Sequence, residues 1–350
     1  MTFLGKFDTI ILDFVYSLQD IQFYFSSEKE MLKMLSFKNI ELTNDVKKAN
    51  AITHRGCFHA DEIFATIVIM YILKTVVLAR ISLEEVPKKS HSVFQPIIYD
   101  IGGGVFDHHQ PGGNGMRENG IRYSSFGLIW RSFGTRALEE GFSCNHKDAI
   151  LLQEMLDKEF VQGIDAADNG QLQKGTTTVP VMGIPGMIST FMLPNPGNNL
   201  DWENECFLQA LKFADAIFRN VVLSAIAKLK AKDIVEAAIS RSQNEIMVLP
   251  SYVPWKDALF TSANPKARNI LYVVFPSSRN NGYSILAVPK RLGSRYSKKP
   301  FPYQWGGLTG NDLAKVTKIP SAMFCHNDRF IATAKNLDAA LSLARLAIQC

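Results

Sequence analysis

The 350-residue sequence is poor in cysteine and has no long, uncharged apolar run. Its five cysteines are scattered and form no CxxC pair, which excludes a zinc ribbon and the disulfide framework of a small secreted protein. The longest apolar run, Ile63 to Ala79, contains Lys74 and is shorter than the ~20 residues of a transmembrane helix. Asp8, Asp13 and Asp20 interrupt the N-terminal apolar residues, unlike a secretory signal peptide. We therefore expect a cytoplasmic protein with no membrane partner.

The composition excludes disorder, because 47% of the residues are hydrophobic and only 20% are charged. From residue 49 the pattern predicts a short strand, a long apolar helix from about His59 to Arg80, a strand over Val93 to Ile101, and helices from Ser124 and Lys147. This alternation is typical of a parallel α/β sheet. Short β-rich runs follow after residue 242. We expect an N-terminal helical extension over residues 1–48, an α/β domain over 49–241 and a smaller α+β domain over 242–350.

Residues of the types that bind metal ions gather at three expected strand-to-loop junctions, and a further set follows an expected helix. They form four clusters: His54, His59 and Asp61; Asp100 before three glycines; Asp107, His108 and His109; and Asp165 with Asp168. Carboxylates mixed with imidazoles suit Mn²⁺ or a similar first-row ion better than Ca²⁺, which prefers oxygen ligands, or structural Zn²⁺, which prefers thiolates. Their number exceeds the needs of one ion. It matches a site in which two ions activate a water for in-line displacement at phosphorus.

Each cluster alone has a plainer explanation. His59 at a helix start is consistent with a cap, Asp100 with a turn, and Asp165 or Asp168 with a helix-terminal Asx turn. Four such clusters at successive strand-to-helix junctions are hard to produce by turn chemistry, so we favour the metal site. Glu62 is expected on the helix surface or behind the ligands.

Asp107-His108-His109 resembles the signature of the DHH phosphoesterase superfamily. Longer strings resemble one branch of it, the melanocyte proliferating gene (MYG-type) family of metal-dependent phosphoesterases and exonucleases. These strings are Thr53-His-Arg-Gly-Cys-Phe-His-Ala-Asp-Glu62, Tyr99-Asp-Ile-Gly-Gly103, Asp107-His-His-Gln110, Ser124-Ser-Phe-Gly-Leu-Ile-Trp130, Ile164-Asp-Ala-Ala-Asp-Asn-Gly170 and Trp305-Gly-Gly307. The similarity covers about residues 50–350. It implies a parallel-sheet DHH phosphoesterase domain followed by a smaller substrate-binding domain.

The resemblance also implies roles for the clustered residues. His54, His59, Asp61 and His108 would bind the two ions, and Asp100 resembles the bridging carboxylate. Asp107 would ligate an ion or orient its neighbour, and His109, together with Asp107, would act on the phosphate or its leaving group. Either Asp165 or Asp168 would complete the set, and Asp168 is favoured because Asp168-Asn-Gly is similar to the Asp-Thr-Gly of related phosphoesterases. Ser124 and Ser125 are expected to cap a helix rather than to act as nucleophiles.

The segment from Ala258 to Asn311 contains eight Lys and Arg residues and no Asp or Glu. Its charge exceeds the net +5 of the whole chain, so the remainder is net acidic. Aromatic residues are interleaved with the basic ones, and this combination suits single-stranded nucleic acid. The alternative is a solvated basic face with the aromatic residues in the core. The expected substrate-binding residues are Lys290, Arg291, Arg295, Gly306, Gly307, His326 and Arg329.

We therefore expect a metal-dependent phosphodiester hydrolase, and specifically a 3′–5′ RNA exonuclease with two Mn²⁺ or Mg²⁺ ions. One alternative is a phosphatase of a small nucleotide or pyrophosphate on the same metal core. The basic segment favours a polymer, because a small anion needs only two or three cations. Another alternative is a nucleic-acid-binding protein without catalysis, and the complete set of ligand types argues against it.

Overall fold

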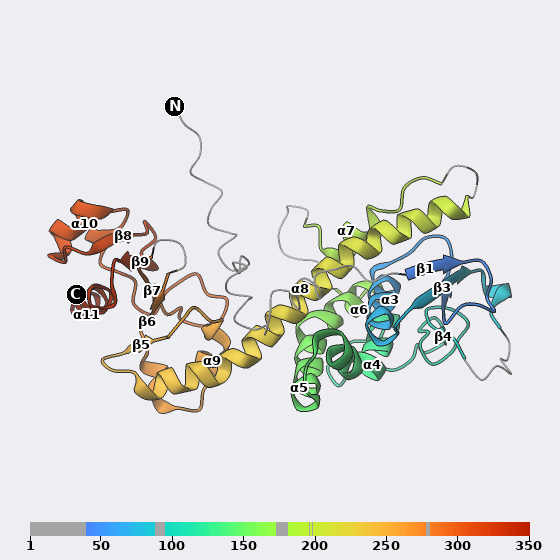
Figure 1. Ribbon diagram of the computed structural model, residues 1–350, viewed down its shortest axis with the longest axis horizontal. Helices are drawn as coiled ribbons and strands as arrows, with labels where there is room; N and C mark the ends of the chain where they lie inside the picture. The colour runs from blue at the N-terminus through green and yellow to red at the C-terminus, as the bar shows by residue number, and fades with distance from the viewer. Residues whose placement is uncertain (1–39, 88–94, 173–180, 196, 198, 278–280) are drawn as a thin grey trace. The chain divides into compact units, whose positions relative to one another are not determined.

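The computed structural model describes residues 40–87, 95–172, 181–195, 197, 199–277 and 281–350 (Figure 1). Within these ranges the chain forms two compact units, an N-terminal unit of residues 40–225 and a C-terminal unit of residues 226–350. Each unit has its own β-sheet. Residues 1–39 of the expected extension, and Arg279 of the basic segment, lie outside the described residues. No helix among the described residues is long and apolar enough to span a bilayer.

The N-terminal unit contains a parallel sheet of four short strands in the order β1-β3-β2-β4. The strands are β1 (Ile40–Thr43), β2 (Ala51–His54), β3 (Val76–Ile81) and β4 (Ile97–Ile98). Strands β2 and β3 consist mostly of apolar residues and are almost wholly buried, as expected for parallel strands that are covered on both faces. The expected parallel α/β sheet is thus confirmed. Two details differ: residues 40–43 are a strand rather than part of a helical extension, and β4 is shorter than the expected strand.

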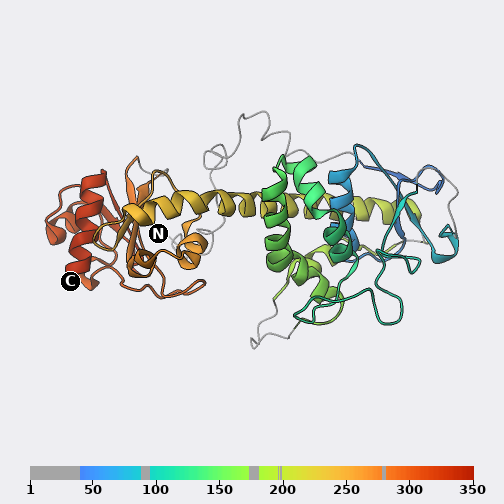
Figure 2. The same ribbon diagram turned by 90° about the horizontal axis from the view of Figure 1, so that it is seen from below.

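Helix α3 (Ala60–Ile72) connects β2 to β3, and all of its residues are buried. Figure 2 shows it between the sheet and helix α4 (Ser125–Phe142), which packs against it. The ring of Phe64 stacks on Phe126 of α4 with centroids 5.3 Å apart. Because α3 is covered on every side, the residues of its first turn have little freedom to move.

The helix expected from His59 to Arg80 is too long. It ends at Ile72, because the exposed Lys74 and Thr75 form a polar turn within the apolar run. The β-branched pair Val76-Val77 then begins strand β3, in agreement with the preference of such residues for strands. One apolar run therefore contains a helix, a turn and a strand.

The remaining helical segments of this unit are η1 (Leu83–Glu85), α5 (His146–Leu156), the π-helical turn η2 (Asp157–Val161), α6 (Gln162–Asp168) and α7 (Ile184–Ser189). The single long helix α8 (Leu200–Arg241) begins in this unit and continues beyond residue 225. Helices α4 and α6 approach closely at Gly127. A Cβ atom on Gly127 would lie 2.0 Å from Oδ2 of Asp165, so only glycine fits there.

The C-terminal unit is built on a five-stranded mixed sheet in the order β5-β6-β7-β9-β8. The strands are β5 (Ile246–Val248), β6 (Tyr272–Pro276), β7 (Tyr283–Ala287), β8 (Ala322–Cys325) and β9 (Ile331–Ala334). Strands β5 and β6 are parallel and the other pairs are antiparallel. The helical segments are α9 (Trp255–Thr261), η3 (Pro265–Asn269), η4 (Tyr303–Trp305), α10 (Gly310–Thr317) and α11 (Leu337–Gln349).

Both faces of this sheet are covered by helices. Along strand β6, alternate residues belong to the core clusters on the two faces. Tyr272 and Val274 belong to a core cluster with α11, whereas Val273 and Phe275 belong to a cluster with the end of α8 and with α9. This division follows from the alternation of side chains along a strand. Several buried residues in both clusters lie within the acid-free segment, so part of that segment forms core rather than surface.

The close approach at Gly127 predicts that Gly127→Ala destabilises the protein. The added methyl group would overlap the carboxylate of Asp165, and such overpacking costs about 1–3 kcal/mol in the free energy of unfolding. The measurement is urea denaturation of the full chain followed by circular dichroism.

Gly163→Ala in α6 is the matched control, because a Cβ atom there meets no other atom within 4 Å. Its helical position should make the alanine variant as stable as wild type or more stable by about 0.5–1 kcal/mol. If both variants were as stable as wild type, the close approach of α4 and α6 would not constrain the fold.

Candidate metal centre

The candidate ligands come together at one edge of the parallel sheet. His54 is the last residue of β2, and Asp100 follows shortly after β4, which pairs with β2. Asp61 lies in the first turn of α3, immediately after the loop that leaves β2. The carboxyl ends of neighbouring parallel strands lie at the same edge of a sheet, which is why these side chains meet.

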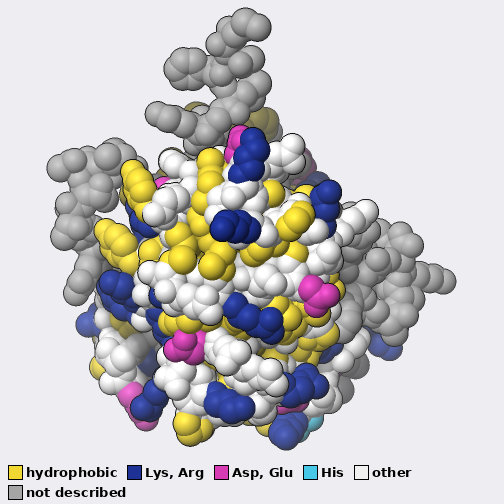
Figure 3. Space-filling model, turned by 90° about the vertical axis from the view of Figure 1, so that its left-hand side faces the viewer, with side chains coloured by type: hydrophobic (Ala, Val, Ile, Leu, Met, Phe, Trp, Pro, Cys, Tyr) yellow, Lys and Arg dark blue, Asp and Glu magenta, His cyan; other side chains and the backbone are white. Residues whose placement is uncertain are grey.

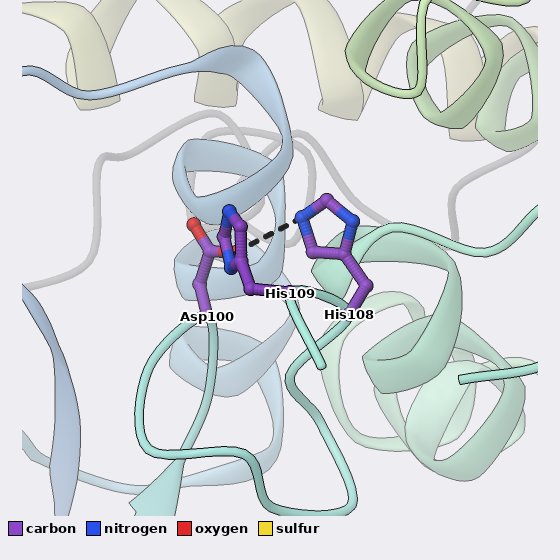
Figure 4. A group of neighbouring side chains, drawn as sticks. All are labelled: Asp100, His108 and His109. Atoms are coloured by element: carbon purple, nitrogen blue, oxygen red, sulfur yellow. Dashed lines mark ion pairs between the residues drawn. The ribbon is translucent and has the colours of Figure 1, made fainter. Parts of the chain in front are cut away.

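Asp100 lies at the centre of this arrangement. Its Oδ2 is 3.1 Å from Nε2 of His54, and its Oδ1 is 3.3 Å from Nε2 of His108 and 3.6 Å from Nδ1 of His109. Figure 4 shows the imidazoles of His108 and His109 directed toward the Asp100 carboxylate. The backbone φ of Asp100 is 58°, a left-handed conformation that aspartate adopts more readily than most residues. The backbone strain found at this residue is typical of functional sites.

Three groups of side chains each place their ligand atoms within 4.8 Å of one another. They are Asp100, His108 and His109; His54, Glu62 and Asp100; and His59, Asp61 and Asp168. Asp100 belongs to the first two groups. Nε2 of His108 lies 3.6 Å from Oδ2 of Asp61 and 3.3 Å from Oδ2 of Asp168, and so joins the third group to the first. The groups are therefore one connected cluster.

The cluster concentrates negative charge away from water. The side chains of Asp61, Glu62 and Asp100 are at most 1% exposed, and Oδ1 of Asp61 has no hydrogen-bond partner among the described residues. Burial, together with repulsion from the neighbouring carboxylates, raises the pKa of Asp61 well above its ordinary value. Buried carboxylates are stable only when cations or hydrogen-bond donors compensate them. An unpartnered carboxylate oxygen beside imidazole nitrogens therefore fits a divalent cation.

The imidazole of His54 supplies part of this compensation. Burial alone would lower the pKa of His54, but its hydrogen bonds to Asp100 and Glu62 raise it to about 11. Burial alone would raise the pKa of Asp100, but hydrogen bonds from His108, His54 and Ser125 hold it below its ordinary value. Only neutral imidazole binds a metal ion, so an ion that enters the cluster must displace these protons.

Glu62 is part of the cluster and is not on the helix surface, as one of the two sequence-based interpretations had it. Its Oε1 lies 3.0 Å from Nε2 of His54, and its Oε2 accepts a hydrogen bond of 2.7 Å from the backbone N–H of His59. The surface interpretation is wrong because the first turn of α3 is covered by the rest of the unit. Glu62 thus contacts both ends of the loop that separates His54 and His59.

The structure separates the two aspartates of α6, which the sequence left as alternatives. Asp168 faces His108 and belongs to the ligand cluster. Asp165 is fully buried, with Oδ2 2.8 Å from Nη1 of Arg117 and Oδ1 accepting from the Ser124 hydroxyl at 2.7 Å and from the Gly127 N–H at 3.0 Å. Asp165 therefore ties α6 to α4, and we propose Asp168 as the ligand.

Arg117 was missed by the sequence analysis, and no local signal marks it. Its guanidinium also pairs with Asp157 and lies over the ring of Tyr123 at 4.2 Å. Burial raises the pKa of Asp165 to about 6 even though Arg117 and Ser124 oppose that rise. The buried guanidinium of Arg117 compensates the carboxylate of Asp165, which would otherwise add to the negative charge of the cluster.

The serine pair at the start of α4 also has a role that the sequence did not reveal. Ser124 occupies the N-cap position as predicted, but its hydroxyl donates to Asp165 rather than capping the helix. The hydroxyl of Ser125 donates to Oδ1 of Asp100 at 2.8 Å. Both serines therefore orient carboxylates, which explains why the pair stands at this junction.

Asp107 and His109 form a hydrogen-bonded pair at the rim of the cluster. Oδ1 of Asp107 accepts from Nδ1 of His109 at 2.8 Å, and Oδ2 accepts from the Gly103 N–H at 2.7 Å. Asp107 thus holds the imidazole ring of His109 and the glycine loop. The side chain of His109 is 59% exposed, so substrate can reach it.

The sequence profile of MYG1_exonuc, described as an uncharacterised protein family (UPF0160), matches residues 50–348. The chain belongs to this family. The MYG1 protein of Saccharomyces cerevisiae is 29% identical over 345 residues, which cover 90% of this chain and 100% of the relative. The MYG1 protein of Schizosaccharomyces pombe is 30% identical over 319 residues, covering 85% and 96%. The human MYG1 exonuclease is 28% identical over 325 residues, covering 84% of each chain. No solved structure gives a significant match.

The predicted resemblance to the MYG-type family is thereby confirmed. The family match also covers the C-terminal unit, where the expected substrate-binding residues fall into two places. Lys290, Arg291 and Arg295 are exposed on the loop after β7. The other four residues lie around the end of β8 and the turn to β9: Gly306, Gly307, His326 and Arg329.

Only part of the basic and aromatic content of this unit is available to a ligand. The ammonium groups of Lys266, Lys298 and Lys299 donate to backbone carbonyls. Among the aromatic residues, Phe301 and Trp305 are buried; others, such as Tyr296 and Tyr303, are exposed. On the face of the unit drawn in Figure 3, Lys and Arg side chains are spread among apolar ones and acidic side chains are sparse.

Because Asp168 and Asp165 have different surroundings, we expect one substitution to weaken metal binding and the other to lower stability. Asp168→Asn is expected to weaken Mn²⁺ binding strongly while leaving the metal-free protein folded, because its carboxylate faces the cluster and is partly exposed. Asp165→Asn removes the fully buried one of the two carboxylates that pair with Arg117 and should lower the free energy of unfolding by about 3–5 kcal/mol.

Calorimetric titration of Mn²⁺ and thermal denaturation of the metal-free variants separate these effects. Asp157→Asn is the control, since it removes the other carboxylate from Arg117 without touching α4. A stable Asp165→Asn variant with lost Mn²⁺ binding would reverse the two roles.

Proposed function

We propose that this member of the MYG1_exonuc family is a metal-dependent phosphodiester hydrolase that shortens single-stranded RNA from its 3′ end. The connected cluster of carboxylates and imidazoles around Asp100 is the observation that carries the proposal. The mouse and human relatives bear the name MYG1 exonuclease, which supports a nucleic acid as the substrate. The proposed ions are two Mn²⁺ or Mg²⁺.

The two oxygens of Asp100 face different partners, and this supports a pair of ions. Oδ2 lies against His54, which also contacts Glu62, whereas Oδ1 faces His108 and His109. A carboxylate shared in this way suits the bridging position between two ions. Bound divalent ions would lower the pKa of a water and stabilise the charge that develops on the phosphate oxygens.

His109 is the residue best placed to exchange a proton with the substrate. Its Nδ1 is held by Asp107, so its Nε2 is the atom left to face a phosphate or a leaving group. The ring is exposed, unlike the ring of His108, which is 9% exposed within the cluster. Asp107 therefore positions the imidazole, and His109 carries the proton.

The C-terminal unit would hold the polymer. The domain proposal remains an α/β domain of the DHH type over residues 49–241 and a substrate-binding domain over 242–350. Lys290, Arg291 and Arg295 supply exposed cations for phosphates, and Tyr296 supplies a ring that is 76% exposed for stacking on a base. A polymer makes use of all of these groups, whereas a small nucleotide or pyrophosphate would need few of them.

Asp100→Asn and His108→Ala are each expected to abolish hydrolysis of 5′-labelled single-stranded RNA in the presence of Mn²⁺. Asparagine accepts the left-handed backbone of Asp100 but lacks its charge, and alanine removes an imidazole that faces three carboxylates. The measurement is product length on a denaturing gel, compared with DNA, a dinucleotide and pyrophosphate in parallel reactions.

Asp45→Asn, at an exposed aspartate that takes part only in local contacts of its turn, is the control and should keep full activity. Wild-type activity in either site variant would contradict the metal centre. Hydrolysis of pyrophosphate alone would replace the nuclease with a phosphatase. Tight RNA binding without hydrolysis of any substrate would indicate a binding protein.

Replacing Lys290, Arg291 and Arg295 together by alanine should reduce the salt dependence of RNA binding. Each phosphate contact on a single strand contributes a slope of roughly 0.7 in log K against log salt, so three contacts contribute about 2. The KM for an oligonucleotide should rise, while hydrolysis of a dinucleotide should change little because the cluster is untouched. Both substrates are assayed across a salt series.

The matched control replaces three exposed basic residues of the same unit that lie outside the acid-free segment, namely Lys315, Lys335 and Arg345. This variant has the same net charge as the first. If the two variants changed the salt slope equally, binding would depend on net charge alone. Equal losses on the oligonucleotide and the dinucleotide would mean that the loop after β7 supports the metal centre.

A further inference from the structure

The peptide group between Arg55 and Gly56 links a candidate ligand to helix α8. Nδ1 of His54 lies 3.1 Å from the carbonyl oxygen of Arg55. A carbonyl oxygen only accepts, so Nδ1 must be the donor and Nε2 is left to face Asp100 and Glu62. The Arg55 carbonyl therefore determines which nitrogen of His54 is turned toward the cluster.

The other side of the same peptide group is held by a carboxylate. The N–H of Gly56 donates to Oε2 of Glu203, near the start of α8, at 3.1 Å. The C=O and N–H of a trans peptide point in opposite directions. The result is a continuous chain of hydrogen bonds from the Glu203 carboxylate through one peptide group to the His54 ring.

The surroundings of Glu203 fix this chain in place. Oε1 of Glu203 accepts from Nδ2 of Asn195 at 2.8 Å. The buried guanidinium of Arg80 donates to the Gly56 carbonyl at 2.9 Å and lies over the ring of Phe207 at 4.5 Å. Gly56 has φ 87°, a conformation that favours glycine. The loop between His54 and His59 is thus held by β3 and α8, and not only by the elements that it joins.

We propose that Glu203 is a positioning residue for His54, acting through the Arg55–Gly56 peptide group. The carboxylate polarises the peptide, so its carbonyl becomes a stronger acceptor for Nδ1–H, and Nε2 becomes a better ligand. Groups that hold a ligating histidine in this way are worth about 10–100-fold in metal affinity or activity. The inference rests on the proposed metal centre and adds α8 to the elements that build it.

The test measures Mn²⁺ affinity by calorimetry on the full-length, chelator-treated protein, without substrate. Glu203→Ala removes the acceptor and should weaken Mn²⁺ binding by about 10–100-fold. Glu203→Gln keeps an oxygen that can accept from Gly56 and should restore most of the affinity. Asn195→Ala is the matched control, because it removes the other hydrogen bond of Glu203 and leaves the Gly56 contact intact.

Three results would overturn the inference: wild-type affinity in Glu203→Ala, equal losses in Glu203→Ala and Asn195→Ala, or no rescue by Glu203→Gln. If Glu203→Ala melts below the assay temperature, Glu203→Met repeats the test, because it keeps the length of the side chain and lacks both oxygens. A wild-type protein that binds no Mn²⁺ would overturn the metal centre itself. Wild-type binding with unchanged variants would overturn the role of Glu203 alone.

Discussion

Repulsion between buried carboxylates is the constraint on which the N-terminal unit depends. The first turn of α3 and the residue after β4 bring Asp61, Glu62 and Asp100 into a space that excludes water. Carboxylates in such a place destabilise the fold unless cations and donors surround them. The elements α4, α6 and the His108 loop therefore do two things around this space: they pack apolar side chains, and they supply hydrogen-bond donors and cations to the carboxylates.

Cationic side chains of the protein itself compensate part of this buried negative charge and leave part of it uncompensated. Arg117 compensates Asp165, and the imidazole of His54 compensates Glu62 and Asp100. Asp61 keeps one oxygen without a hydrogen-bond partner among the described residues. The carboxylate of Asp165 is paired with a guanidinium that stays charged and stabilises the fold, whereas the carboxylates beside imidazoles could hold a metal ion once those imidazoles are neutral.

The sequence was sufficient to predict those structural features that depend on a local pattern of residues. His54 and Asp100 were predicted to meet because each lies at the end of an expected parallel strand, and the strands of the C-terminal unit agree with the β-rich runs expected after residue 242. The sequence favoured Asp168 over Asp165 only through a resemblance, because the surroundings of Asp165 depend on Arg117, which belongs to a distant loop. For the same reason no pattern revealed that Lys298 and Lys299 donate to carbonyls while Lys290 is exposed. Contacts between segments that are distant in the sequence determine both the role of Asp165 and the exposure of each lysine.

The complete burial of α3 has a consequence for the growing chain. Its apolar surface is covered chiefly by α4, which is synthesised some 60 residues later. At about 5–20 residues per second, the helix leaves the ribosome several seconds before its cover exists. During that interval the first half of the β2–α3–β3 unit presents an apolar helix to the surrounding solution. Exposed apolar surface of this kind favours aggregation, so the segment that carries Asp61 and Glu62 is the part of the unit most exposed to it during translation.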